Sequence, residues 1–135
     1  MNIFKSGYER LQKLFEIKPY EVGLIEMDVT PRMYLILRED LSFKYIQGAH
    51  ALAHFAYCYP FEFKKWNNGY LICLSVFNGR ALNKLVEKVL YPNKVELVEF
   101  WEPDLQSDLA TAVCLFDDGI NSYRDLIKHL PLASK

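Results

Sequence analysis

The chain has 135 residues and a formal net charge of −1, and its composition is 51% hydrophobic and 24% charged. These values exclude a mainly disordered chain, because such chains have too few apolar side chains to form a core. The length predicts one domain, and no apolar run approaches the ~18 residues that a transmembrane helix needs. The first residues also lack the apolar core of a signal peptide, so we expect a cytoplasmic protein with no membrane partner.

Residues 1–31 are predicted to form an N-terminal extension that contains one amphipathic helix. Apolar side chains recur three and four residues apart over residues 5–16, which is helical spacing, and Pro19 follows the pattern. The stretch Glu21–Val29 fits either a strand or an edge segment, and a Thr-Pro pair after it marks a break.

Four short apolar runs in the rest of the chain are predicted to be strands. Continuous runs of this kind suit strands buried on both faces of a sheet that helices cover. They span residues 33–37, 70–76, 95–100 and 109–116. Three helices are predicted from apolar residues with helical spacing. They run from Ser42 to about Tyr59, from Asn78 to Leu90 and from Ile120 to Leu130.

This alternation of strands and helices predicts the fold class. We expect a single three-layer α/β/α domain over residues 1–135, with a mixed, mostly parallel sheet of about four strands. Residues 117–135 are expected to add a C-terminal helix after the last strand.

The three cysteines, Cys58, Cys73 and Cys114, are widely spaced, and no pair has the C-x-x-C spacing of a metal or redox site. Free cysteine is commonly buried, so we expect three buried free thiols. The sequence predicts no metal and no cofactor.

Charge is unevenly divided along the chain. Residues 32–92 carry eight Lys or Arg against four Asp or Glu, whereas residues 93–135 carry four against eight. The weakly basic half could meet an anion such as RNA. Alternatively, both halves fold together and their charges mix over one surface, since the sequence shows no dense basic patch.

The predicted helix after Ser42 carries Gln47, His50 and His54 on one face of an otherwise apolar segment. Such polar groups need partners or a cleft, because burying them unpaired is costly. Three interpretations stay open: a metal site, a satisfied network in the core, or a functional cleft whose helix N-terminus offers free N–H groups to a phosphate. Zinc proteases with this histidine spacing have Glu after the first His, where this chain has Ala51.

The same segment resembles the second type of peptidyl-tRNA hydrolase. That family has a strand ending in Arg-x-Asp-Leu, a Gly-Lys-rich turn, and a helix with Ala-Gln-x-x-His-Ala. The matching residues here are Arg38, Asp40 and Leu41 after the strand, and Gln47, His50 and Ala51 on the helix. Weaker similarity continues through Trp66–Val76, Glu102–Leu105 and Thr111, so the resemblance covers about Arg32 to Phe116.

The resemblance implies hydrolysis of the ester between a peptide and tRNA. It implies five catalytic residues. Glu102 or Asp104 would orient the water or act as the base. Thr111 would bind near the acyl group. Lys44 would hold a phosphate or the oxyanion, and His50 would support the cleft.

The resemblance also implies a substrate-binding set. Ser42 at the helix end would help to hold the anion, Gln47 would line the cleft, and Arg38 and Asp40 would complete the site. A simpler role is open for Asp40, which could cap the turn before the helix.

A second function stays open, namely a catalytically inactive module of the same fold that binds RNA or a protein partner. The turn between Leu41 and Gln47 is shorter than that of the family and holds one lysine, Lys44. Aromatic residues between Phe55 and Trp66 are interleaved with lysines, a pattern that can stack bases or form a core edge or dimer contact. The expected partners are tRNA or peptidyl-tRNA and a second copy of the chain, because family members tend to form homodimers.

Overall fold

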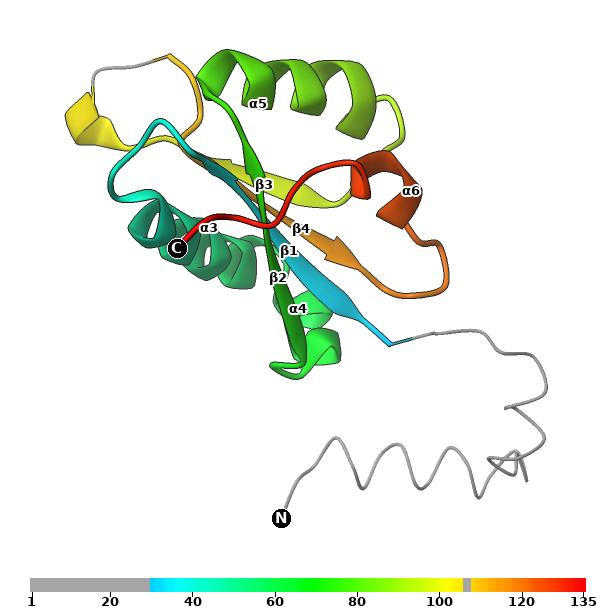
Figure 1. The fold of residues 1–135 in the computed structure, drawn as a ribbon. Helices are drawn as coiled ribbons and strands as arrows, with labels where there is room; N and C mark the ends of the chain where they lie inside the picture. The colour runs from blue at the N-terminus through cyan, green and yellow to red at the C-terminus, as the bar shows by residue number, and fades with distance from the viewer. Residues whose placement is uncertain (1–29, 106–107) are drawn as a thin grey trace, which may run out of the picture.

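Four strands form one mixed sheet in the computed structural model, which describes residues 30–105 and 108–135 (Figure 1). The strands are β1 (Arg32–Arg38), β2 (Tyr70–Val76), β3 (Leu97–Phe100) and β4 (Ala112–Asp117), and their order is β2-β1-β4-β3. The predicted mixed α/β fold is therefore confirmed. The helix predicted over residues 5–16 and the segment Glu21–Val29 lie outside the described residues.

The position of β4 makes the sheet less parallel than predicted. β1 is parallel to β2, but β4 lies between β1 and β3 and is antiparallel to both. Three strands therefore share one direction, while two of the three neighbouring pairs are antiparallel. The described residues of the link from β3 to β4 contain no crossover helix, and an antiparallel pair needs none.

Strand β1 is buried on both faces. Met33, Leu35 and Leu37 belong to an apolar cluster on one face of the sheet, and Tyr34 and Ile36 belong to a cluster on the other. The continuous apolar run that predicted this strand is explained by packing on each side.

The helix α5 (Gly79–Leu85) continues as a π-helical turn, η2 (Val86–Leu90), and together they fill the predicted helical range. Asn78 caps the start of α5, because its side-chain oxygen accepts a hydrogen bond from the N–H of Ala81 at 2.9 Å.

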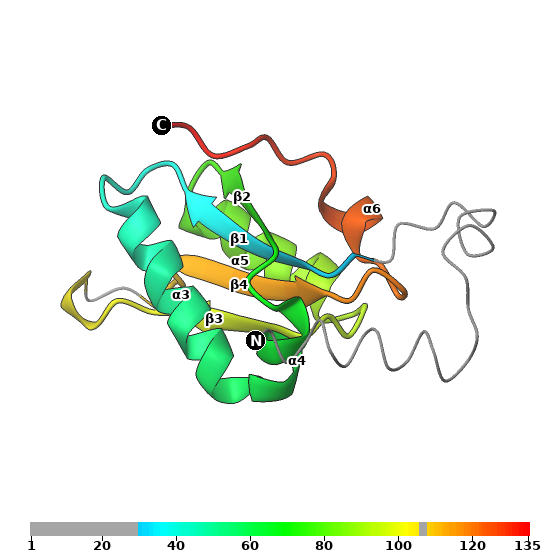
Figure 2. The ribbon, with the colours of Figure 1, turned by 90° about the horizontal axis from the view of Figure 1, so that it is seen from below.

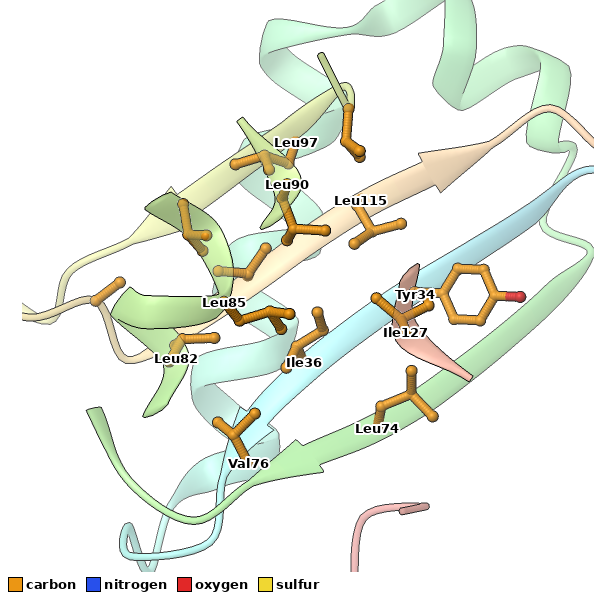
Figure 3. Close-up of a cluster of buried hydrophobic side chains, with 14 residues drawn as sticks. Tyr34, Ile36, Leu74, Val76, Leu82, Leu85, Leu90, Leu97, Leu115 and Ile127 are labelled. Atoms are coloured by element: carbon orange, nitrogen blue, oxygen red, sulfur yellow. The ribbon is translucent and has the colours of Figure 1, made fainter. Parts of the chain in front are cut away.

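One face of the sheet is covered by α5, η2 and the short helix α6 (Arg124–Ile127). Figure 3 shows Leu82, Leu85 and Leu90 gathered above Ile36 and its neighbours on the strands. This cluster is the larger of the two apolar cores.

The other face is covered by α3 (Lys44–Cys58) and α4 (Pro60–Trp66) (Figure 2). The predicted N-cap is wrong, because Phe43 occupies that position and no side chain caps the helix, so Ser42 lies outside it. Pro60 follows the end of α3 as predicted, but it also begins α4, which the sequence did not indicate. Proline fits the first turn of a helix because the N–H groups there have no acceptor within the helix, so the N–H that proline lacks costs no hydrogen bond.

Small residues bring α3 close to the sheet. A Cβ atom on Gly48 would lie 2.7 Å from Cδ2 of Leu37 and 3.2 Å from Cδ1 of Leu35. One turn further on, Ala51 is fully buried against the same face. This close approach places the first turns of α3 beside the ends of β3 and β4.

The C-terminal helix is shorter than predicted. Asp117 at the end of β4 accepts hydrogen bonds from the N–H of Gly119 at 2.7 Å, the hydroxyl of Ser122 at 2.8 Å and the N–H of Tyr123 at 3.1 Å. These bonds hold the chain in a loop, so α6 starts only at Arg124. Polar side chains that bond nearby backbone groups compete with helix formation in this way.

Residues Pro131–Ser134, here called the C-terminal strap, run along the outer edge of β2. The N–H of Ser75 donates to the carbonyl of Pro131 at 2.9 Å, and the N–H of Ala133 donates to the carbonyl of Cys73 at 2.8 Å. The strap therefore satisfies part of an edge that would otherwise expose unpaired backbone groups.

The thiols do not all follow the prediction. Cys114 is buried, and its burial raises the pKa of its thiol. Cys73 is half-buried, and Cys58 is exposed near the end of α3, so the expectation of three buried thiols is wrong for Cys58.

Within residues 30–105 and 108–135, every helix falls short of the length and apolar character needed to cross a bilayer.

Gly79 gives a test of the packing at the end of β1. A Cβ atom there would lie 2.9 Å from Cζ and Nη1 of Arg38 and 3.0 Å from Cδ1 of Leu109. The Arg38 guanidinium cannot move away freely, because it is bonded to Asp40 and to the carbonyl of Ala110. We expect Gly79→Ala to lower the free energy of unfolding by ~1–3 kcal/mol, measured by chemical denaturation.

The control is the same substitution in an Arg38→Met background. The cost of Gly79→Ala should shrink there, because the crowded guanidinium is gone. An equal cost in both backgrounds would show that the clash with Arg38 is not the cause.

Candidate functional site

A pocket of about 410 Å³ opens at the N-terminal end of α3, beside the link between β3 and β4. That link contains the 3-10 turn η3 (Pro103–Leu105). The volume falls within the range of about 300–1,000 Å³ that is usual for small-molecule sites. The lining combines apolar and polar residues: Leu41, Phe43, Ile46 and Leu105 are apolar, and Ser42, Gln47, Glu102 and Asp104 are polar or charged.

A chain of hydrogen bonds fixes the carboxylate of Glu102 at this pocket. Gln47 donates from Nε2 to Oε2 of Glu102 at 3.2 Å, and its Oε1 accepts from the hydroxyl of Thr111 at 2.7 Å. The Thr111 hydroxyl also lies 3.1 Å from the carbonyl oxygen of Phe100, which accepts from the Thr111 N–H at 2.7 Å. Thr111 and Gln47 are both buried. The chain therefore ties α3 to the ends of β3 and β4.

Gln47, His50 and His54, here called the polar stripe of α3, had three possible interpretations. The environment of Gln47 fits two of them, the satisfied network and the functional cleft. Its amide is a buried group with both ends paired, which is what a buried side-chain amide requires. It also lines the pocket, as the cleft interpretation expected.

The two histidines of the stripe lie in other environments. His50 is exposed and stacks on Phe100, with ring centroids 4.9 Å apart and an angle of 9° between the rings. His54 is exposed, and its Nε2 lies 3.6 Å from Sγ of Cys58. Neither residue is among those that line the pocket. The described part of the chain contains no group of three His, Cys, Asp or Glu side chains placed to hold a metal ion.

Lys44 is directed away from the pocket toward the C-terminal strap. Its ammonium donates to Oε2 of Glu39 and to the hydroxyl of Ser134, each at 2.6 Å. Ser134 in turn donates from its N–H to Oε1 of Glu39 at 2.9 Å. The hydrogen bond from Lys44, together with the bonds from Ser134, lowers the pKa of Glu39 to about 2. The resemblance gave this lysine the role of holding a phosphate or the oxyanion, but its ammonium is bonded to a carboxylate.

Arg38 and Asp40 bind each other. Nε and Nη2 of Arg38 reach the two carboxylate oxygens of Asp40 at 3.0 and 2.8 Å, and Nη1 reaches the carbonyl of Ala110 at 3.2 Å. This paired, planar geometry is the strong form of an arginine–carboxylate contact. It braces the end of β1 against the residue that precedes Thr111.

The structure thus divides the nine predicted site residues. Those at the pocket are Ser42, Gln47, Glu102 and Asp104 in the lining and Thr111 bonded to Gln47. Those outside the lining are Arg38, Asp40, Lys44 and His50.

The apolar lining of the pocket was missed. Phe43 and Ile46 are 65% and 55% exposed, although their sequence context suggested a helix buried on most sides. A signal was present, because the two residues lie three apart at the start of the helix and therefore on one side of it.

The pocket brings groups of opposite electrostatic character to one place. Glu102 and Asp104 are the charged side chains among its described lining residues. Residues at the start of α3 also line the pocket, so the positive end of the helix dipole lies near it, and the first N–H groups of the helix have no acceptor within the helix and no side-chain cap. A carboxylate and backbone donors therefore meet in one cavity.

Neither a family model nor a curated protein matches the sequence. A solved structure does share the fold: a protein of unknown function from Agrobacterium tumefaciens, with a TM-score of 0.57 and 13% sequence identity. The match covers 78% of this chain and 98% of that chain. At this identity the likeness shows the fold alone.

Thr111→Val tests the buried chain of hydrogen bonds. Valine has nearly the same shape but leaves Oε1 of Gln47 without its donor, so we expect a loss of ~1–3 kcal/mol in the free energy of unfolding, measured by urea denaturation. Ser42→Ala is the control, because it removes an exposed hydroxyl and should change stability by less than about 0.5 kcal/mol. Equal effects of the two substitutions would contradict a structural role for the Thr111 hydroxyl.

The contact between Glu39 and Lys44 predicts a pH dependence of stability. The pKa of Glu39 falls from its ordinary value of 4.5 to about 2 in the folded protein. A carboxylate with a lowered pKa stabilises the fold above its unfolded pKa, and this contribution is lost as the pH falls through the folded pKa. We therefore expect the wild type to be more stable than Glu39→Gln near neutral pH, with the difference vanishing as the pH falls from 4.5 to about 2.

Thermal unfolding of the two proteins across this range measures the effect. A difference in unfolding temperature that stays constant with pH would contradict the titration of Glu39.

Proposed function

We propose that this chain is a hydrolase of the type II peptidyl-tRNA hydrolase kind, which cleaves the ester between an aminoacyl or peptidyl group and tRNA with Glu102 as its base. The observation that carries the proposal is the hydrogen-bonded chain from Thr111 through Gln47 to Glu102. The resemblance named Gln47, Thr111 and either Glu102 or Asp104 from three separate segments, and hydrogen bonds link the first two to Glu102 beside the pocket. The proposal selects Glu102 over Asp104 as the base because Gln47 orients Glu102 alone.

The geometry supports direct attack by water. Glu102 takes a proton from a water molecule while the water oxygen attacks the ester carbonyl carbon. The oxyanion that forms faces the N–H groups in the first turn of α3, which supply the electrostatic stabilisation that such an intermediate needs. Collapse breaks the bond to the ribose oxygen, and the proton on Glu102 passes to that oxygen. The products are a free acid and the tRNA hydroxyl.

The composition of the pocket supports the absence of a covalent intermediate. Its described lining contains one hydroxyl, from Ser42, and neither histidine nor cysteine. A serine nucleophile requires a neighbouring base within hydrogen-bond reach. Ser42 makes no such pair with His50, which stacks on Phe100.

We also propose a three-layer α/β/α arrangement, tRNA as the partner, a homodimer and a cytoplasmic location. The apolar clusters on the two faces of the sheet support the layers. The partner, the dimer and the location rest on the resemblance.

A second candidate function is a catalytically inactive module that binds a partner through the same pocket. The position of Lys44 favours it, because the cation that would hold a phosphate is bonded to Glu39 and Ser134 instead. The exposed side chains of Phe43 and Ile46 would then supply apolar contact area for a protein partner.

Release of the acyl group from charged tRNA tests the proposal. We expect the wild type to accelerate the release and Glu102→Gln to lower kcat/KM by about 100-fold or more, because an amide cannot take the proton from water. Glu87→Gln is the matched control, since this carboxylate is exposed on η2 on the opposite face of the sheet, and it should leave the rate unchanged.

Three outcomes separate the candidates. A rate that drops only in Glu102→Gln supports the hydrolase. A wild type that binds tRNA or a protein partner without accelerating release supports the binding module. Equal rates in the wild type and Glu102→Gln contradict the assignment of the base.

A further inference from the structure

A second groove lies on the face of the sheet that α5 covers, between α5 and the residues that follow α6. It has a volume of about 300 Å³ and is here called the α5 groove. Val76 and Leu85 line it and belong to the larger apolar cluster (Figure 3). Ala81, Val89 and Leu130 also line it, and they pack against that cluster but are only half-buried. The described part of the chain therefore leaves this apolar surface partly uncovered.

The other residues that line the α5 groove are basic. They are Lys84, Lys88 and His129, all of them exposed, and none of the described lining residues is Asp or Glu. Among the described residues, neither lysine forms an ion pair. Glu87 is the neighbour of Lys88 in the chain but lies outside the lining. An apolar surface beside unpaired positive charge suits an occupant that is apolar and acidic.

The segment Glu21–Val29, here called the N-terminal segment, has this composition. It contains no Lys, Arg or His. Its three carboxylates are Glu21, Glu26 and Asp28, and its apolar residues are Val22, Leu24, Ile25, Met27 and Val29. The segment lies outside the described residues, which begin at Thr30.

The order of residues in the N-terminal segment separates the two kinds of side chain. In an extended chain, alternate residues point to opposite sides. Ile25, Met27 and Val29 then share one side, and Glu26 and Asp28 share the other. One side can thus cover the apolar lining of the α5 groove while the other presents carboxylates to the lysines.

The spacing of the charges also agrees. Lys84 and Lys88 are four residues apart, which places them roughly 6 Å apart along a helix and on one side of it. Glu26 and Asp28 are two residues apart, which is about 7 Å in an extended chain. Each carboxylate can therefore meet one ammonium at the same time.

The N-terminal segment is long enough to reach the α5 groove. In the register of the two strands, Arg32 lies opposite Tyr70 and Arg38 lies opposite Val76. Val76 is thus six residues, or roughly 20 Å, along the sheet from the start of β1. Nine extended residues span about 30 Å, so the segment can extend from Thr30 to the groove.

We propose that the N-terminal segment docks in the α5 groove of its own chain, with Glu26 and Asp28 bound to Lys84 and Lys88. Docking covers the apolar residues that the groove leaves open and makes the N-terminal extension part of the domain. This inference is independent of the proposed hydrolase activity, because the α5 groove and the pocket beside α3 share no lining residue.

Hydrogen exchange of the full chain, followed by mass spectrometry, tests the docking. We expect the amides of residues 22–29 to exchange at least about tenfold more slowly than in a synthetic peptide of the same sequence, which means that the segment is docked about nine-tenths of the time. Lys84→Glu with Lys88→Glu should remove most of this protection, because two attractions become repulsions. Adding Glu26→Lys with Asp28→Lys to that variant should restore it.

Two controls separate docking from changes in the fold. Arg80→Glu reverses an exposed charge on α5 outside the groove and should leave the protection of the segment unchanged. Glu26→Lys with Asp28→Lys alone changes no described residue, so it should remove the protection of the segment while the amides of β1 stay protected.

Three results would overturn the proposal. The first is a wild-type segment that exchanges as fast as the synthetic peptide. The second is protection that persists in Glu26→Lys with Asp28→Lys, or that the combined charge swap fails to restore. The third is protection that rises with protein concentration, because the segment would then occupy the groove of a second copy.

Discussion

Strand β1 has a hydrogen-bonded neighbour on each edge and an apolar cluster on each face, and the other elements are placed relative to it. Its alternating side chains belong to both cores, so the strand is buried from Met33 onward. Helix α3 can lie close to it because Gly48 has no side chain. That approach brings Gln47 within reach of Thr111, so the packing of an apolar strand positions the polar groups of the pocket.

The pocket and the C-terminal strap use neighbouring residues of α3 for different purposes. Gln47 bonds toward the link between β3 and β4, whereas Lys44 bonds to Glu39 and Ser134. A buried amide and a largely buried ammonium both need partners, and in each case the fold supplies one from a residue distant in the sequence. The pocket stays negatively charged as a result, because the cation near the helix end is already paired with a carboxylate.

Much of the fold could be predicted from local pattern. The four strands and the helices α3 and α5 came from runs and spacings that packing then satisfied. The predictions were wrong where a specific hydrogen bond, or one to a residue distant in sequence, determines the local structure. Asp117 holds a loop in place of helical turns, and Lys44 pairs with Ser134, which lies 90 residues away. No local pattern carries that information. The resemblance singled out Gln47, Thr111 and either Glu102 or Asp104, but the hydrogen bonds that join Gln47 to Thr111 and Glu102 came from the structure.

The order of the strands also bears on how the chain can fold. β4 comes last of the four in sequence, yet it lies between β1 and β3, so neither of these can complete its pairing until β4 arrives. The part of the chain from β1 to β2 is a contiguous unit that includes α3 and α4. It can form earlier, because its contacts are closer in sequence. Until β4 pairs with β1, the free edge of β1 in this unit is open to other chains. Insertion of β4 is thus the step at which folding and aggregation compete.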